Sequence, residues 1–105
     1  MADFVHLHNH TDYSLLDAAQ TVDVMCNRAY DLGMDSIAVT DHGNLFAMLP
    51  FYQEAKKTGI KAILGCEIYV AVNNHTEKKQ VTTLNGKTWG YHHLVLLAQN
   101  LTGYK

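Results

Sequence analysis

The chain has 105 residues, 48% of them hydrophobic and 17% charged, and a formal net charge of −2. This length suits one small domain, and the composition excludes a disordered or low-complexity protein. The slightly acidic balance excludes a domain that holds nucleic acid by bulk electrostatic attraction, because phosphate binding requires a clear basic excess.

The cysteine pattern and the absence of targeting signals both indicate a cytosolic protein. Cys26 and Cys66 form no CxxC pair, so we expect two reduced thiols in a cytosolic protein. Residues 1–4 contain no basic and apolar leader, and the longest aliphatic run, residues 94–98, is too short to span a bilayer. We therefore expect a cytoplasmic location and no membrane partner.

Residues 4–10 alternate with a period of two, which predicts a strand. Three of the side chains on one face are imidazoles, and a polar loop over residues 11–20 follows with Asp17 near its end. The residues that share this face are Phe4, His6, His8 and His10.

Two helical patterns come next. Residues 22–32 carry one apolar stripe, with Thr21 as the expected N-cap and Gly33 as the terminating glycine. Residues 48–58 carry a second stripe, in which Pro50 must lie in the first turn. Short apolar runs predict strands at Ser36–Thr40 and Ile60–Leu64, with an extended continuation over residues 67–72.

The remaining sequence predicts a polar segment and one more strand. Residues 73–90 are polar, with a turn expected at Asn85-Gly86. Residues 93–98 form an apolar strand, and residues 100–105 begin another helix. The alternation of strands and helices predicts an α/β fold with a mainly parallel sheet.

Residues with metal-binding side chains follow three successive predicted strands. His8 and His10 end the first, Asp41 and His42 follow the second, and Glu67 follows the third. The carboxyl ends of parallel strands meet at one edge, so we expect these groups to converge. Imidazoles with carboxylates suit Zn, Mn or Fe, and a bridged pair of such ions can activate water in phosphoryl transfer. The sequence therefore predicts a divalent-metal site that cleaves phosphate esters.

Several of these residues have ordinary alternative roles. Asp17 also suits a loop or capping aspartate, and Glu67 also suits a surface charge. His6 lies early in its strand, so we expect it to be deeper and to orient a ligand rather than to bind metal. Adjacent strand residues point to opposite faces, so at most one of His92 and His93 can face the site.

The same motifs, in this order, resemble the PHP (polymerase and histidinol phosphatase) domain family, and within it the domains of bacterial DNA polymerase III alpha subunits. The resemblance covers essentially the whole chain and rests on residues 4–11, 13–17, 37–43, 65–69 and 93–98. It implies a distorted (β/α)7 barrel with several zinc, manganese or iron ions. Asp41 would orient His42 or help to poise the site as a catalytic neighbour. By position, the implied metal ligands are His8, His10, Asp17, His42, Glu67 and His93.

The resemblance also implies a domain boundary and a function. The family's other ligands lie on later strands, so residues 1–105 are expected to form the first part of one PHP domain; Ala18 departs from the usual glycine. The parent protein would be a DNA-directed DNA polymerase that binds DNA and other replicative subunits, including a proofreading subunit. The domain itself would be a metal-dependent phosphoesterase or a 3′–5′ exonuclease. The alternatives are a stand-alone phosphatase of the histidinol-phosphate type and a structural metal-binding scaffold.

Overall fold

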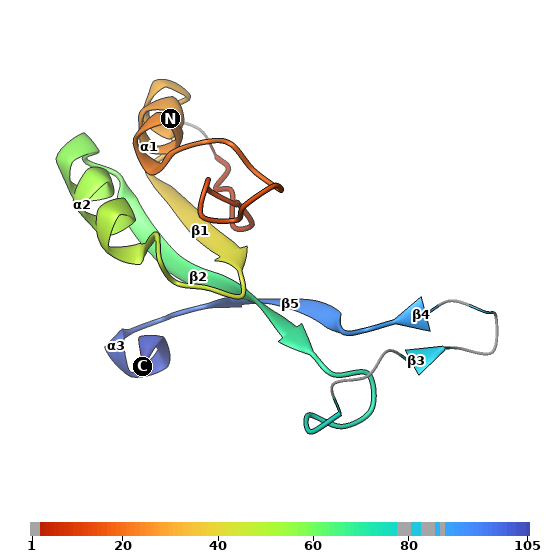
Figure 1. The fold of residues 1–105 in the computed structure, drawn as a ribbon. Coiled ribbons are helices and arrows are strands. Elements are labelled where there is room, and N and C mark those ends of the chain that lie inside the picture. Colours follow the sequence, from red (N-terminus) through yellow and green to blue (C-terminus); the bar gives the residue numbers. More distant parts are fainter. Residues whose placement is uncertain (1–2, 78–80, 83–85, 87) are drawn as a thin grey trace.

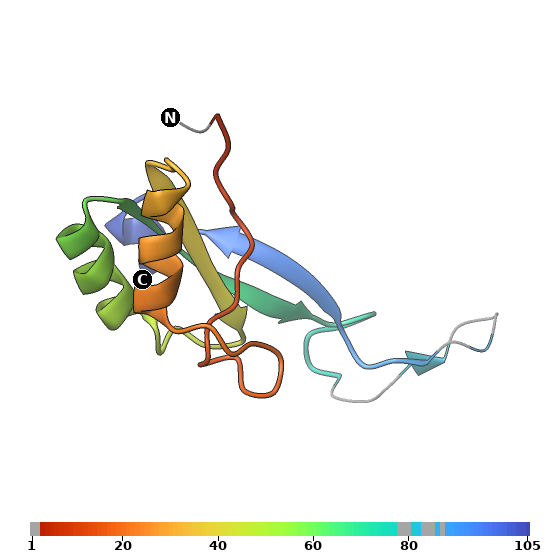
Figure 2. The ribbon, with the colours of Figure 1, turned by 90° about the horizontal axis from the view of Figure 1, so that it is seen from above.

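The computed structural model describes residues 3–77, 81–82, 86 and 88–105, and it has an α/β architecture. Helices α1 and α2 pack side by side against the sheet, and β3 and β4 lie on an arm that extends away from the helices (Figures 1 and 2). Within the described residues, none of the helices combines the length and apolar character that a bilayer span requires. The elements in chain order are α1 (Val22–Asp31), β1 (Ser36–His42), α2 (Met48–Thr58), β2 (Lys61–Val70), β3 (Val81–Thr82), β4 (Thr88–Trp89), β5 (His92–Leu97) and α3 (Leu101–Tyr104).

The main sheet has the strand order β1-β2-β5 and contains both kinds of pairing. Strands β1 and β2 are parallel, from Ser36 opposite Lys61 to His42 opposite Glu67, because α2 carries the chain back between them. Strand β5 is antiparallel to β2, with Val70 opposite His92. The α/β fold class is therefore confirmed, and β5 is the strand that departs from the parallel direction expected for most of the sheet.

The expected strand over residues 4–10 is not a strand in the structure, although this segment lies along the free edge of β1. The main-chain N–H groups of Ala38 and Thr40 donate to the carbonyls of His6 and Asn9 at 3.0 and 2.8 Å. Between these two bonds the segment advances three residues while β1 advances two, which breaks the register. The Asn9 N–H donates to Thr40 Oγ1 and its side-chain amide donates to the Ala38 carbonyl, so side chains replace part of the ladder.

The first predicted helix is confirmed, with both of its expected ends. Thr21 is the N-cap in extended conformation, although its hydroxyl donates to Asp23 instead of capping the helix. Gly33 follows the last turn at φ 75°, a left-handed conformation that favours glycine. Cys26 is fully buried under this helix. Burial raises the pKa of its thiol to about 11, so the thiol is neutral at physiological pH.

The second predicted helix is also confirmed, and Pro50 lies in its first turn. Phe51 and Ala55 point inward and pack with residues of α1 and β1 in one core. Both cysteines are free thiols, as expected. The core therefore lies between the two helices and the β1–β2 half of the sheet, while β5 remains largely exposed on its other side. The buried members of this core from α1 and β1 are Met25, Cys26, Ala29, Ile37 and Val39.

The segment between β2 and β5 contains a feature that the sequence did not predict. Strands β3 and β4 pair in antiparallel fashion, with Val81 opposite Trp89. The expected turn at Asn85-Gly86 lies partly outside the described residues; Gly86 itself has φ 79°. At the other end of β5, Asn100 Oδ1 accepts the Gly103 N–H at 3.0 Å, and this cap confirms the predicted start of a helix.

Gly65 lets three chain segments approach one another in the middle of the sheet. A Cβ atom at this position would lie 2.6 Å from the Leu96 carbonyl oxygen and 2.9 Å from Thr40 Cγ2. The Leu96 oxygen belongs to the main chain of β5, so it cannot move without disturbing the pairing with β2.

We therefore predict that Gly65→Ala destabilises the protein by about 1–3 kcal/mol, the usual cost of overpacking. Thermal unfolding followed by circular dichroism measures this loss. Gly103→Ala is the matched control, because its Cβ would meet nothing closer than 3.8 Å. Equal midpoints for the two variants would contradict the packing described for Gly65.

Candidate metal centre

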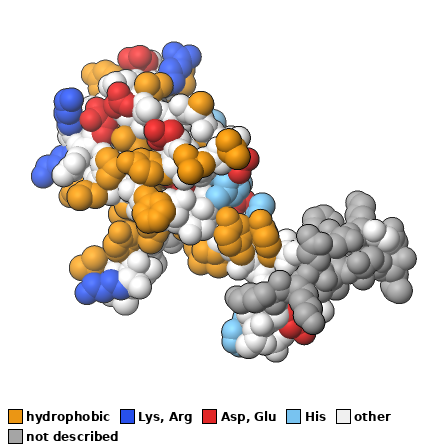
Figure 3. All heavy atoms as spheres, in the orientation of Figure 1, with side chains coloured by type: hydrophobic (Ala, Val, Ile, Leu, Met, Phe, Trp, Pro, Cys, Tyr) orange, Lys and Arg blue, Asp and Glu red, His pale blue; other side chains and the backbone are white. Residues whose placement is uncertain are grey.

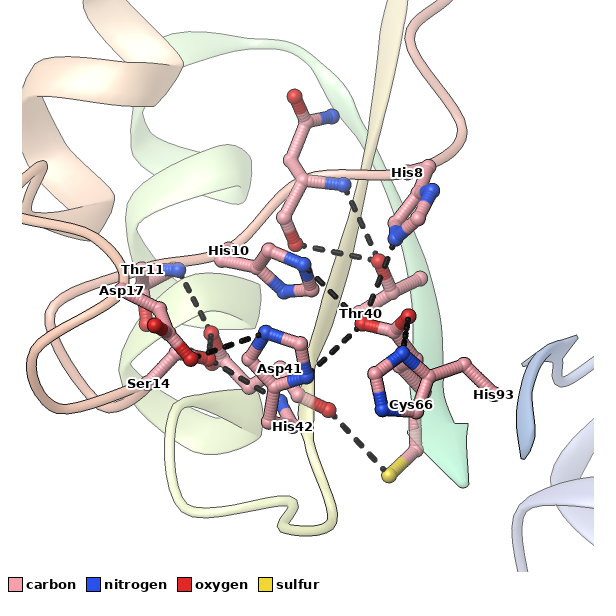
Figure 4. Close-up of polar contacts among 12 residues, drawn as sticks. His8, His10, Thr11, Ser14, Asp17, Thr40, Asp41, His42, Cys66 and His93 are labelled. Carbon is pink, nitrogen blue, oxygen red and sulfur yellow. Dashed lines mark hydrogen bonds and ion pairs between the residues drawn. The ribbon is translucent and has the colours of Figure 1, made fainter. Parts of the chain in front are cut away.

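Glu67 is the common neighbour of four imidazoles. Its side chain is only 6% exposed and lies near the carboxyl end of β2. Figure 4 shows His8, His10, His42 and His93 converging from different parts of the chain. The ring nitrogens of His8, His10 and His42 lie 3.4, 3.1 and 2.9 Å from Glu67 Oε2, and His93 Nδ1 lies 3.2 Å from Oε1.

The sheet register explains how His42 and His93 reach the same carboxylate. His42 is directly opposite Glu67 in the parallel pair of β1 and β2. His93 is opposite Tyr69, two residues further along β2 and on the same face as Glu67. Because β5 is antiparallel, its amino end lies at the carboxyl end of β2. This is why a histidine at the start of a strand joins histidines at the ends of others.

Asn9 positions the two histidines that flank it. Its main-chain and side-chain bonds to Thr40 and Ala38 fix this part of the N-terminal segment against β1. His8 and His10 consequently face Glu67 from the free edge of β1. The two rings meet edge to face, with centroids 5.1 Å apart.

Asp17 lies on the outer side of His42. Its Oδ2 is 3.3 Å from His42 Nε2, and its side chain is 63% exposed. The His42 ring therefore lies between two carboxylates, with Nδ1 towards Glu67 and Nε2 towards Asp17. His10 stacks on the same ring at a centroid distance of 4.0 Å. The arrangement fixes the plane of the His42 ring.

Asp41 is fully buried and organises the loop that carries Asp17. Its carboxylate accepts the Thr11 N–H at 2.6 Å, the Thr11 hydroxyl at 2.8 Å and the Ser14 hydroxyl at 2.7 Å. Ser14 Oγ in turn accepts the His42 N–H at 3.0 Å. Asp41 was expected to orient His42 or to help poise the site, and its contact with His42 is indirect. The carboxylate reaches the main chain of His42 through Ser14.

The donor set fits a divalent cation. Two groups, His8-His10-Glu67 and His42-Glu67-His93, each offer three ligand atoms within 4.8 Å of one another. Glu67 Oε2 and His10 Nδ1 are buried and make no hydrogen bond, although imidazole nitrogens lie within 3.4 Å of Oε2. These short distances thus reflect orientations that suit ligands around an ion better than hydrogen bonds. Imidazole and carboxylate together are typical ligands of zinc, manganese and iron.

Two further sequence expectations concern residues near the cluster. His6 is exposed and packs edge to face on Phe4 at 4.8 Å, so the prediction of a deeper position is wrong. Only one of the adjacent residues His92 and His93 was expected to face the site, and His93 is the one beside Glu67.

Cys66 points to the other face of the sheet, where its Sγ lies 3.5 Å from the Asp41 carbonyl oxygen. Burial raises the pKa of the Cys66 thiol.

Sequence reasoning missed the residues that hold the site in place. Thr11, Ser14 and Thr40 are buried, and their hydroxyls join the loop and the N-terminal segment to β1. The available signal was Asp41 itself, an acidic residue that directly follows a buried apolar strand. Such a carboxylate requires donors, and the hydroxyl residues of the preceding loop were the nearest candidates.

The family profile of the PHP domain matches residues 6–105 of this chain. The chain belongs to the PHP domain family. Similar curated proteins include DNA polymerase III subunit alpha of Borreliella burgdorferi, 50% identical, and that of Treponema pallidum, 45% identical, each over 102 residues. Each match covers 97% of this chain but 8% of the relative, so this PHP segment spans a small part of the relatives' length.

Solved structures with a similar fold include proteins whose names differ from those of these relatives. An amidohydrolase from Chromobacterium violaceum has a TM-score of 0.66 at 23% identity, over 90% of this chain and 27% of that one. A protein of Bifidobacterium adolescentis, described as a metal-dependent phosphoesterase, has a TM-score of 0.53 at 21% identity, over 67% and 23%. At these identities the likeness concerns the fold, and it agrees with the prediction of a partial PHP-type fold.

Asp41→Ala should loosen the loop over residues 11–17. The substitution removes the acceptor of three buried hydrogen bonds, so we expect amide hydrogen exchange at Thr11 and His42 to accelerate about 100-fold. Exchange measured residue by residue in the purified protein tests this. Asp12→Ala, at an exposed position of the same loop, is the control. Unchanged protection of both amides would refute the proposed role of Asp41.

Proposed function

We propose that this chain is the first part of the PHP domain of a bacterial DNA polymerase III alpha subunit. Identities of 50% and 45% over nearly the whole chain to two proteins of that name support this assignment. The parent protein is then a DNA-directed DNA polymerase that works in the cytoplasm, with DNA and other replicative subunits as partners. A separate proofreading subunit is among the partners that this assignment proposes.

The PHP domain itself is proposed to be a metal-dependent phosphoesterase that acts on DNA 3′ ends. The observation that carries this proposal is the buried Glu67 carboxylate with four imidazoles at 2.9–3.4 Å. In the net reaction, water adds to phosphorus, the bond to the 3′ oxygen of the preceding nucleotide breaks, and that oxygen takes up a proton. A nucleoside 5′-monophosphate is released.

The side chains of the cluster divide this task. Bound zinc, manganese or iron ions would supply Lewis acidity and a more acidic water. Glu67 joins the two groups of ligands and supplies the negative charge that retains cations. Asp17 fixes the orientation of His42 from the solvent side, and Asp41 keeps the loop of Asp17 in place. The proposed ligands are His8, His10, Asp17, His42, Glu67 and His93.

The two alternatives receive less support. A stand-alone phosphatase of small molecules would use the same cluster, but the curated relatives at 37–50% identity share the name DNA polymerase III subunit alpha. A structural scaffold would keep the ligands only for the folding energy that a bound metal provides. Catalysis distinguishes the scaffold from the enzyme, because both bind metal.

The test measures release of nucleotides from the 3′ end of single-stranded DNA by the full-length protein in the absence of deoxynucleoside triphosphates. We expect removal of metal by a chelator to stop release and Glu67→Gln to slow it at least about 100-fold, because losing a ligand disturbs the site more than losing an outer partner. His75→Ala is the control, because His75 is exposed and outside the cluster. Equal rates for Glu67→Gln and the native protein would refute the proposal. Absence of release by the metal-loaded native protein would favour the scaffold.

A further inference from the structure

A second compartment adjoins the histidine cluster. A cavity of about 390 Å³ opens between the loops that follow the N-terminal segment and β1 on one side and the ends of β2 and β5 on the other. Figure 3 shows histidine side chains directly beside hydrophobic ones on this face of the molecule. The volume lies within the range of ligand pockets. Its lining includes Tyr13, Asp17, His42, Phe46, Tyr69 and Tyr91.

The walls of this cavity are fixed by specific contacts. The Asn44 side-chain amide donates to the Tyr13 and His42 carbonyls at 3.2 and 3.0 Å, and its Oδ1 accepts the Phe46 N–H at 3.2 Å. Tyr69 lies against Gly43, where a Cβ atom would be 2.6 Å from the Tyr69 ring. Gly43 has φ 61°, so both its conformation and its missing side chain suit this approach. The sequence fragment Gly43-Asn44 thus shapes the cavity.

The cavity has two chemically different ends, one lined by histidines and one lined by aromatic rings. No lysine or arginine is among the described residues that line it, so the lining offers a phosphate no permanently positive side chain. The phosphate must bind at the histidine end, where His42 and His93 belong to the proposed metal centre. The other end carries aromatic rings, which favour a flat and weakly polar group.

Two tyrosines present open aromatic surface next to that metal centre. The rings of Tyr69 and Tyr91 lie 4.4 Å apart at an angle of 60°, and Tyr91 lies 5.4 Å from the His93 ring. Both tyrosines are about half exposed, at 49% and 48%. Nucleic-acid bases stack on such rings without strong sequence preference. A base covalently attached to a phosphate at His93 would meet the Tyr91 ring first.

The geometry points to a nucleobase subsite: the base of the 3′-terminal nucleotide stacks on Tyr91 and Tyr69 while its phosphate lies at the histidine cluster. This inference rests on the proposed function and adds the part of the substrate that the cavity recognises. It makes Tyr91 a positioning residue for the terminal nucleotide. Because stacking does not read base edges, any of the four bases fits.

The experiment compares two single strands that differ only in whether the 3′-terminal residue carries a base. With the metal-loaded full-length protein, we expect the KM for removal of the baseless residue to be roughly 10-fold higher. Tyr91→Ala should abolish this difference by raising the KM for the normal strand with little change in kcat. Tyr91→Phe should retain the difference, since it keeps the ring. Tyr52→Ala, on α2 and away from this cavity, is the matched control.

A second readout does not depend on catalysis. A strand with 5-iodouracil as its 3′-terminal base should photocrosslink to the peptide that contains Tyr91 or Tyr69. A full preference for the base in Tyr91→Ala, or a crosslink that maps elsewhere, would overturn the subsite. If the native protein cleaves neither strand, the proposed function fails, while the crosslink still reports whether the base occupies this cavity.

Discussion

The burial of the Glu67 carboxylate among imidazoles is the constraint on which the site depends. Glu67 is 4% exposed, and a buried carboxylate is costly unless positive charge or hydrogen bonds compensate it. The imidazoles around it come close without forming hydrogen bonds to Oε2. A bound cation would compensate the charge directly, and it could share His10 Nε2, which lies 3.1 Å from Oε2. The rest of the fold brings these groups to one place.

Asp41, on the neighbouring strand, is a second buried carboxylate, and hydrogen bonds offset the cost of its burial. It is as deeply buried as Glu67, yet three donors from the loop over residues 11–17 satisfy its oxygens. One carboxylate is therefore structural and the other is available for ligands. The distinction follows from the alternation along the strands, because Asp41 pairs with Cys66 and His42 pairs with Glu67 on the other face.

Local signals made the helices and the converging residues predictable. Helix positions depend on signals within a few residues, namely the apolar stripes, the Thr21 cap and the glycines that follow α1 and α2. The convergence of the metal-binding residues follows from the general rule that the carboxyl ends of parallel strands meet at one edge. The direction of β5 depends on the path of the connection over residues 71–91, so local sequence patterns could not show that His93 lies at the shared edge. The donors to Asp41 and the side-chain bonds of Asn9 arise only from tertiary contacts.

Anomalous scattering from a crystal of the metal-loaded protein, recorded at the absorption edge of the bound metal, tests the role of Glu67 most directly. The account predicts at least one peak within about 2.0–2.3 Å of a Glu67 oxygen and of two or more ring nitrogens from the four histidines around it. A crystal in which the metal lies elsewhere, with Glu67 instead accepting hydrogen bonds from protonated imidazoles, would contradict it.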